Sequence, residues 1–278
     1  MITIRSVYFE ALELKIPKSI IYFALQEITG FSYTELTEHF DDRIKDYFGF
    51  KFAMMRYQRG EMIEYIFNKA YFLSVPFYVD QSVLIPRQET EQLVKTTIKM
   101  IRNKYPNGGA VIADVCTGSG VIGLYIAKKL IGNKYYLSDI SKEALRVADI
   151  NRKRLELSDV ALLEGDMLSP FIEQGIKIDV LVCNPPYIEN QETIDERTRN
   201  QEPHLALLAK PSTLFYEMIF KDYQKVMNSN FLMAFEIGED MEEKLTVLIK
   251  KYLPSCKYRF EKDMYKKTRF LFIEQNEI

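Results

Sequence analysis

One short segment of the chain places an amide, two prolines and an aromatic ring directly after an apolar run. Asn184-Pro185-Pro186-Tyr187 follows Val180–Cys183, which predicts a buried strand that ends at this point. Neither proline carries an N–H, so the local backbone offers carbonyl acceptors without competing donors. The Asn184 side-chain oxygen and the Pro185 carbonyl can together accept both hydrogens of a planar NH2 group, while the Tyr187 ring offers a flat surface beside it. We therefore predict Asn184, Pro185 and Tyr187 as catalytic residues and all four as substrate-binding residues. The alternative is a plain strand-to-loop stop.

A glycine-rich turn predicts a cofactor site elsewhere in the chain. Asp114–Gly120 follows one apolar run and precedes a helical segment, so its backbone can approach a ligand closely and present free N–H groups. Asp139 ends the next predicted strand, nineteen residues after Gly120, where a carboxylate can accept hydrogen bonds from a ribose diol. The alternative for Asp139 is a cap on the helix expected to start at Ser141.

Gly165-Asp166-Met167 ends the third predicted strand, where Asp166 can accept from an adenine amino group and Met167 can cover the ring. The context before Gly118 differs from a dinucleotide fingerprint, and the turn lacks the lysine of a triphosphate-binding loop. These features favour S-adenosylmethionine, with S-adenosylhomocysteine as product, over NAD. The predicted cofactor-binding residues are Cys116, Thr117, Gly118, Ser119, Gly120, Asp139, Asp166, Met167 and Asn184.

Composition excludes several classes of protein. The 278 residues contain 37 Lys+Arg and 39 Asp+Glu, a formal net charge of −2, which argues against stable nucleic-acid binding. The three cysteines are far apart and there are two histidines, so we expect no metal site and no disulfide framework. No signal peptide or membrane-spanning apolar run is visible. We expect a cytoplasmic monomer.

The change in residue pattern along the chain predicts two domains joined by a connector. Residues 1–70 show helical spacing, with a capping box at Ser32–Glu35, and predict a helical bundle for substrate recognition that exposes Tyr57, Tyr65 and Phe67. Residues 71–88 suggest a hairpin-like connector. Residues 89–278 alternate strands and helices, which predicts an α/β fold with a mostly parallel sheet. The expected strands are 111–115, 135–137, 160–163, 179–183, 231–237 and 269–273.

Several segments taken together resemble bacterial peptide chain release factor glutamine methyltransferases. They are Leu84–Glu91 (Leu-Ile-Pro-Arg-Gln-Glu-Thr-Glu), Thr117–Gly120, Ser138–Leu145, Asp179–Ile188, Glu202–Leu207 and Phe235–Gly238, in the order in which that family has them. The resemblance covers residues 55 to 240 well. It implies a Rossmann-like class I S-adenosylmethionine-dependent methyltransferase domain after a small N-terminal helical bundle. It also implies methyl transfer to the side-chain amide of the Gln in the Gly-Gly-Gln motif of class I release factors.

The chain departs from the family pattern at four places. Cys116 stands where the family usually has Gly, Gln88 replaces a proline, residues 209–213 replace a glycine-rich acidic stretch, and the final hairpin, Lys262–Arg269, lacks its usual glycine. A Cβ at position 116 is costly if the backbone there needs a positive φ.

Other functions remain open from sequence alone. An amino methyltransferase acting on adenine in DNA or RNA would share the cofactor half and the Asn-Pro-Pro-Tyr segment, although it should carry a more basic surface. A non-catalytic interaction protein could keep the fold as a scaffold. Arg87 and Glu202 could organise the substrate-side wall or form a structural ion pair.

Overall fold

A computed structural model describes residues 1–275, and the chain divides into two compact units. The first comprises residues 1–69 together with residues 196–201, and the second comprises residues 70–195 together with the described residues from Glu202 to 275. Among the described residues, no helix has the length and apolar character needed to cross a lipid bilayer.

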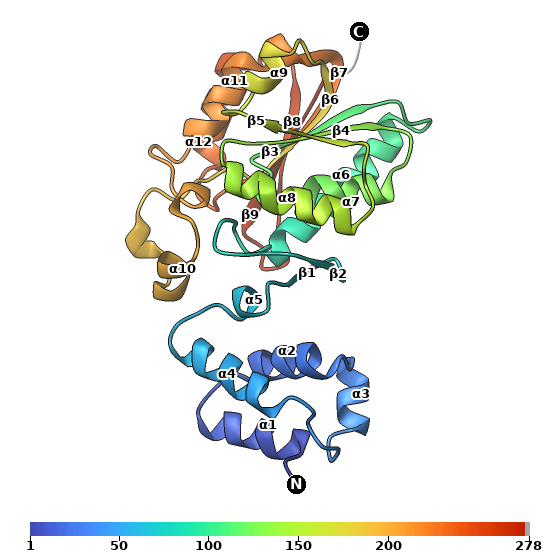
Figure 1. Ribbon diagram of the computed structural model, residues 1–278. Helices are drawn as coiled ribbons and strands as arrows, with labels where there is room; N and C mark the ends of the chain where they lie inside the picture. Colours follow the sequence, from blue (N-terminus) through green and yellow to red (C-terminus); the bar gives the residue numbers. More distant parts are fainter. Residues whose placement is uncertain (276–278) are drawn as a thin grey trace. The chain divides into compact units, whose positions relative to one another are not determined.

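The first unit is a helical bundle around a small apolar core (Figure 1). The predicted capping box is confirmed, since the Ser32 hydroxyl accepts from the Glu35 N–H and the Glu35 carboxylate accepts from the Ser32 N–H. The expected exposure of Tyr65 is wrong, because that ring is 5% exposed. Tyr65 belongs to a helix of a single turn, too short for its apolar spacing to show which side faces the core. The helices are α1 (Ile4–Glu13), α2 (Lys18–Thr29), α3 (Tyr33–Glu38), α4 (Tyr47–Gln58), α5 (Ile63–Ile66) and α10 (Glu196–Gln201).

Helix α10 joins this unit although 126 residues separate it from Lys69. The Arg197 guanidinium lies 3.9 Å from the centroid of the Tyr57 ring and donates to the Tyr57 carbonyl at 3.2 Å. Such a stacked cation typically contributes about 0.5–2 kcal/mol. The first unit therefore has a second covalent connection to the rest of the chain, and composition alone gave no sign of it.

The second unit is built on one mixed sheet with the strand order β5-β4-β3-β6-β7-β9-β8. The first five strands in this order run parallel, and β9 and β8 add two antiparallel pairings at one edge. This confirms the predicted α/β class and its mostly parallel sheet. The strands are β3 (Val111–Val115), β4 (Lys134–Asp139), β5 (Val160–Glu164), β6 (Ile178–Cys183), β7 (Met227–Glu236), β8 (Lys257–Lys262) and β9 (Thr268–Gln275), and a separate antiparallel pair is formed by β1 (Ala70–Phe72) and β2 (Val75–Phe77).

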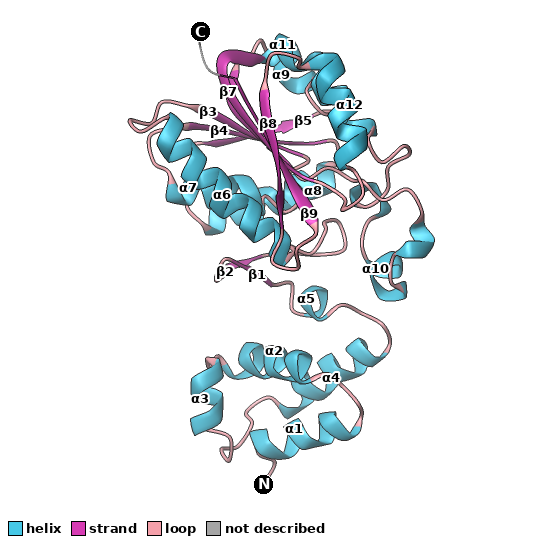
Figure 2. Ribbon diagram, turned by 180° about the vertical axis from the view of Figure 1, so that it is seen from behind, coloured by secondary structure: helices cyan, strands magenta, loops and turns pink. Residues whose placement is uncertain are grey.

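Helices cover both faces of the sheet (Figures 1 and 2). One face carries α6 (Gln88–Lys104), α7 (Val121–Lys129) and α8 (Lys142–Arg154), and the other carries α9 (Ser169–Glu173), α11 (Leu214–Val226) and α12 (Glu242–Tyr252). Phe171, Phe220 and Phe235 are almost completely buried under the second layer. Burying each such ring stabilises the fold by roughly 1.5–3 kcal/mol. The α-layers therefore cover the central strands, whereas the edge strand β8 stays largely exposed.

The order of the strands reverses between β3 and β6. From β3 the chain runs outward through β4 and β5, and it returns to pair β6 with the other side of β3. Ligands of open parallel sheets bind at the carboxyl ends of the strands beside such a switch point. Register places Val115 opposite Cys183, so the glycine-rich turn and Asn184 leave the sheet side by side.

Candidate functional site

A pocket opens at this switch point, and all its walls belong to the second unit. Its lining includes seven residues of the glycine-rich turn and the helix after it, and it reaches the ends of β4, β5 and β6. Eight of the nine residues predicted for the cofactor lie on it, namely Cys116, Thr117, Gly118, Ser119, Asp139, Asp166, Met167 and Asn184. Gly120 is buried just behind this wall.

Asp114 holds the glycine-rich turn in shape. Its Oδ2 accepts from the Thr117 hydroxyl at 2.6 Å and from the Gly123 N–H at 2.9 Å. A Cβ at Gly123 would lie 2.9 Å from the Asp114 Cβ, so only glycine allows this approach. Burial raises the pKa of Asp114 to about 7, against the lowering effect of these two donors. The sequence showed Asp114 as part of the motif without revealing this anchoring role.

The turn requires left-handed backbone at three positions. Gly118 has φ +54°, Gly120 has φ +83° and Cys116 has φ +59°. The departure at Cys116 therefore falls on a residue that does need a positive φ, at a strain of about 1–2 kcal/mol. The Cys116 Sγ lies 3.9 Å from the Met167 Sδ, so its side chain contributes to the pocket wall.

Asp139 connects the end of β4 to this turn. Its Oδ2 accepts from the Gly118 N–H at 2.8 Å and its Oδ1 accepts from the Ser141 N–H at 3.0 Å. The capping alternative is wrong, because Ser141 itself caps α8 by accepting from the Ala144 N–H. Desolvation raises the pKa of Asp139. The Ile140 N–H also acts on this carboxylate, which keeps acceptor capacity for one further donor from the pocket side.

Asp166 and Met167 form the wall at the end of β5. Asp166 is exposed and Met167 is buried, with a positive φ of 45°. The carboxylate and the thioether therefore lie next to each other on one wall, a polar group beside an apolar surface.

Only two residues of the Asn-Pro-Pro-Tyr segment line the pocket. Asn184 and Pro186 line the pocket, whereas the neighbouring Pro185, which is buried, and Tyr187, which is half-buried, are not part of its lining. Arg269 donates to the Tyr187 hydroxyl at 3.4 Å, and a Cβ at Gly238 would lie 3.3 Å from the Tyr187 ring. Tyr187 is thus fixed by contacts from the end of β7 and from β9. Burial raises its pKa to about 12, so its hydroxyl stays protonated.

Of the two alternatives for Arg87 and Glu202, the structural ion pair is confirmed. Arg87 Nη2 donates to Glu202 Oε2 at 2.5 Å, and the Glu202 side chain is fully buried, so the two form a structural ion pair. Glu202 also accepts from the Ile85 N–H at 3.3 Å. Arg87 and Pro203 nevertheless line the pocket, so the pair holds two segments, 84–87 and 202–206, together as one wall.

Two buried polar residues near Asn184 were not predicted from sequence. Thr90, in the first turn of α6, lines the pocket and donates to Glu236 at the end of β7. Both lie in segments that carry the family resemblance, which is the one signal that could have pointed to them.

Comparison with known proteins identifies the family of this chain. Two curated relatives, both named release factor glutamine methyltransferase, match most of the chain. The protein from Mycoplasma mycoides is 31% identical over 263 residues, which cover 92% of both chains. The protein from Clostridium acetobutylicum is 40% identical over 205 residues, covering 72% of this chain and 70% of that one. The chain belongs to the release factor glutamine methyltransferase family.

Two broader comparisons concern the domain type and the fold. The model of the methyltransferase small domain matches residues 92–206. The crystal structure of ribosomal protein L11 methylase from Lactobacillus delbrueckii subsp. bulgaricus aligns with a TM-score of 0.51 at 19% identity, covering 72% of this chain and 84% of that one. At this identity the likeness concerns the fold, and it confirms the predicted Rossmann-like methyltransferase sheet.

Proposed function

We propose that this enzyme transfers a methyl group from S-adenosylmethionine to the side-chain amide nitrogen of the Gln in the Gly-Gly-Gln motif of class I release factors. The observation that carries the proposal is the convergence of the glycine-rich turn and Asn184 on one pocket at the switch point. Family membership supplies the class of substrate, since the curated relatives are named for release factor glutamine.

The pocket has the groups that this cofactor requires. A Cβ at Gly118 would meet no atom within 4 Å, so the turn borders open space that a ligand can fill. Asp139 and Asp166 offer carboxylates for the ribose diol and the adenine amine, and Met167 and Ile140 offer apolar surface. Ser138 Oγ, on the wall, is buried without a hydrogen-bond partner among residues 1–275. A bound ligand or water would satisfy that atom.

The residues beyond β6 suit an amide nucleophile. The sulfonium of the cofactor supplies an electrophilic methyl group. Asn184 Oδ1 and the Pro185 carbonyl would accept the two hydrogens of the substrate NH2, which fixes the direction of the nitrogen lone pair and stabilises positive charge that develops on it. As the N–CH3 bond forms, the S–CH3 bond breaks and S-adenosylhomocysteine leaves, and the amide nitrogen then loses one of its two protons to water. Tyr187 contacts Arg269 and lies close to Gly238. Because Tyr187 does not line the pocket, its proposed role is to support Asn184 and Pro185.

The decisive experiment measures transfer of a labelled methyl group. The wild-type enzyme should label a class I release factor and leave the same factor with Gln replaced by Ala in Gly-Gly-Gln unlabelled. Mass spectrometry should locate the added methyl group on that Gln. Labelling of adenine in DNA or RNA, without labelling of the release factor, would instead establish the amino methyltransferase alternative.

We further propose that the helical unit recognises the release factor outside its Gly-Gly-Gln loop. Helix α4 exposes Phe48 and Phe52, which are 82% and 56% exposed and lie one turn apart. Large exposed aromatics on a helix commonly mark a protein contact. Phe48→Ser should raise KM for the intact release factor and leave KM for a short Gly-Gly-Gln peptide unchanged. Equal effects on both substrates would contradict this role.

A further inference from the structure

The environment of Asn184 contains a buried carboxylate that the proposed chemistry does not use. Glu236 ends β7, which pairs with β6 in a register that places Phe235 opposite Cys183 and so brings Glu236 next to Asn184. Glu236 is 3% exposed. Burying a carboxylate is unfavourable unless it is well hydrogen-bonded, so its presence needs an explanation.

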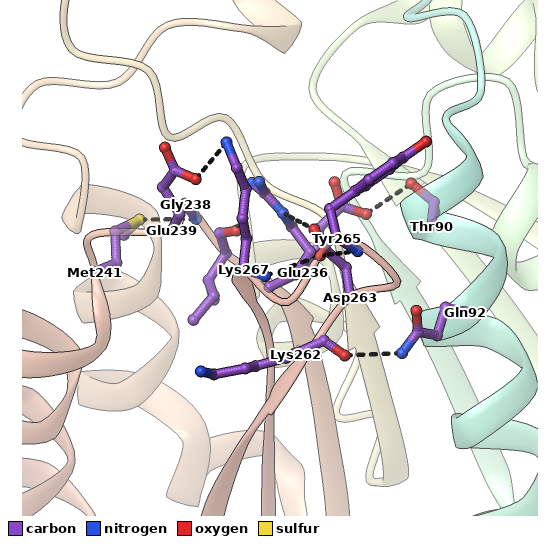
Figure 3. A network of polar contacts seen from close by, with 12 residues as sticks. Thr90, Gln92, Glu236, Gly238, Glu239, Met241, Lys262, Asp263, Tyr265 and Lys267 are labelled. Atoms are coloured by element: carbon purple, nitrogen blue, oxygen red, sulfur yellow. Dashed lines mark hydrogen bonds and ion pairs between the residues drawn. The ribbon is translucent and has the colours of Figure 1, made fainter.

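The explanation begins with Thr90. The Thr90 hydroxyl donates to Glu236 Oε2 at 2.6 Å, as the dashed line between these residues in Figure 3 shows. The same hydroxyl oxygen accepts from Asn184 Nδ2 at 3.5 Å. Thr90 is 3% exposed, so bulk water has little access to its hydroxyl. Three side chains from α6, β7 and the end of β6 therefore form one chain of hydrogen bonds.

Counting donors fixes the direction of this chain. An ionised carboxylate can only accept, so the single proton of the Thr90 hydroxyl is committed to Glu236. Thr90 can then only accept from Asn184, which must turn its NH2 group toward Thr90. Within residues 1–275 no hydrogen bond engages Asn184 Oδ1, so that oxygen stays available to the substrate. The reversed amide would present an NH2 group to the NH2 of the substrate, two donors without an acceptor.

We infer that Thr90 and Glu236 are positioning residues that set the orientation of the Asn184 amide for methyl transfer. The inference rests on the proposed function, because it needs a substrate NH2 that Asn184 accepts. It also states which form of Glu236 is productive. A protonated Glu236 could donate to Thr90, and Thr90 could then donate to Asn184 Oδ1 and draw away the oxygen that the substrate needs.

Several charged or titratable groups surround Glu236 and bear on its ionisation. Desolvation raises its pKa to about 7, and the Thr90 donor and the positive charge of Arg269 oppose that rise. The groups that act on Glu236, or that it acts on, are Arg269 on β9, Glu89 on α6, Arg87 before α6, Tyr187 after β6 and Tyr216 on α11. Asp263 accepts from Arg269 at 3.4 Å and shares its charge. The rate of methyl transfer should therefore fall on the acid side of neutrality.

The test compares Thr90→Val with Thr90→Ser. Valine keeps the shape but removes the hydroxyl, and it should lower kcat by about ten- to a hundredfold, with KM for release factor and cofactor affinity within about threefold. Serine restores the hydroxyl and should recover most of the rate. Thr97→Val is the matched control, because Thr97 is equally buried on the same helix and donates to the Leu93 carbonyl instead.

Two further measurements separate positioning from a structural role. In an Asn184→Ala background, Thr90→Val should have no further effect on kcat, because no amide remains to orient. Glu236→Gln should flatten the acid limb of the pH profile of kcat. Two results with an active wild-type enzyme would overturn this inference alone. One is a Thr90→Val variant with the same kcat as the wild type, and the other is a loss of kcat on Thr90→Val that persists in the Asn184→Ala background. A wild-type enzyme that leaves the release factor unmethylated would overturn the proposed function, and this inference with it.

Discussion

Replacement of Asp139 tests the cofactor site most directly. Its two carboxylate oxygens already accept from the Gly118 and Ser141 N–H groups, at 2.8 and 3.0 Å, and the Ile140 N–H also donates to this carboxylate, which leaves acceptor capacity for a further donor. We expect a hydroxyl of the cofactor ribose to use that capacity. A hydrogen bond to a charged group contributes roughly 1.5–3 kcal/mol, so loss of one such bond weakens binding by about tenfold to a hundredfold.

Asp139→Ala removes both acceptors and should weaken cofactor binding by at least about tenfold. Asp139→Asn keeps one oxygen and should give an intermediate loss. The Ala variant also leaves the N–H of Gly118 without its acceptor, so part of its loss comes from a less ordered turn. Isothermal titration calorimetry measures all three dissociation constants.

A matched control separates this effect from a general loss of charge. Glu164 pairs in register with Asp139 on the neighbouring strand and lies outside the pocket lining, with its side chain 52% exposed. Glu164→Ala should bind the cofactor as the wild type does. If Asp139→Ala bound the cofactor as tightly as this control, the assignment of Asp139 to the ribose would be refuted.

Three other expectations follow from the contacts described above. Asn184→Ala should lower the rate of methyl transfer by roughly 10²–10³, with cofactor affinity within a few-fold of the wild type. Asn184→Asp keeps an acceptor oxygen and should retain partial activity. Equal rates for the wild type and Asn184→Ala in a single-turnover assay would exclude the proposed mechanism. The pKa of Asp114 is raised to about 7 by burial, so the folded state holds more protons than the unfolded state between about pH 4 and 7 and the free energy of unfolding falls as pH rises through this window. Asp114→Asn should make that fall shallower in urea unfolding at pH 5 and pH 8, and an identical slope would show that Asp114 does not titrate as its burial implies. Arg197→Ala removes the cation from the Tyr57 ring and should lower the melting temperature of the helical unit without changing cofactor affinity; an unchanged melting curve would show that α10 is held by other contacts.

The cofactor half of the site could be predicted from the sequence because parallel strands have a strong local pattern. Each predicted strand ends where its polar residues begin, and the carboxyl ends of parallel strands meet at one edge of the sheet. The sequence pattern therefore predicts that Asp139 and Asp166 lie at one edge of the sheet, and both line the pocket. The strand boundaries were less certain, since β7 begins at Met227, four residues before the predicted start.

The substrate half of the site could not be predicted in the same way, because it is built from contacts between segments that are far apart in the sequence. No periodicity relates Thr90 to Glu236, which are 146 residues apart, or Arg87 to Glu202, which are 115 apart. A buried polar side chain looks in sequence like any solvated one, because its cost is set by neighbours that the chain brings to it only on folding. The same holds for α10, whose six residues contain too little apolar pattern to reveal that they belong with the N-terminal helices.

What the sequence determined by itself was the order of elements, the chemistry of the motif residues and the family, because these depend on local spacing and residue type. What only the tertiary structure decided was which polar groups share a hydrogen bond and in which direction the proton lies. The register of β7 against β6 places the Glu236 carboxylate beside Asn184. That placement decides that the amide turns its oxygen, and not its NH2 group, toward the substrate. Hydrogen-bond direction is a property of a closed network of donors and acceptors, and such a network exists only after the strands have paired.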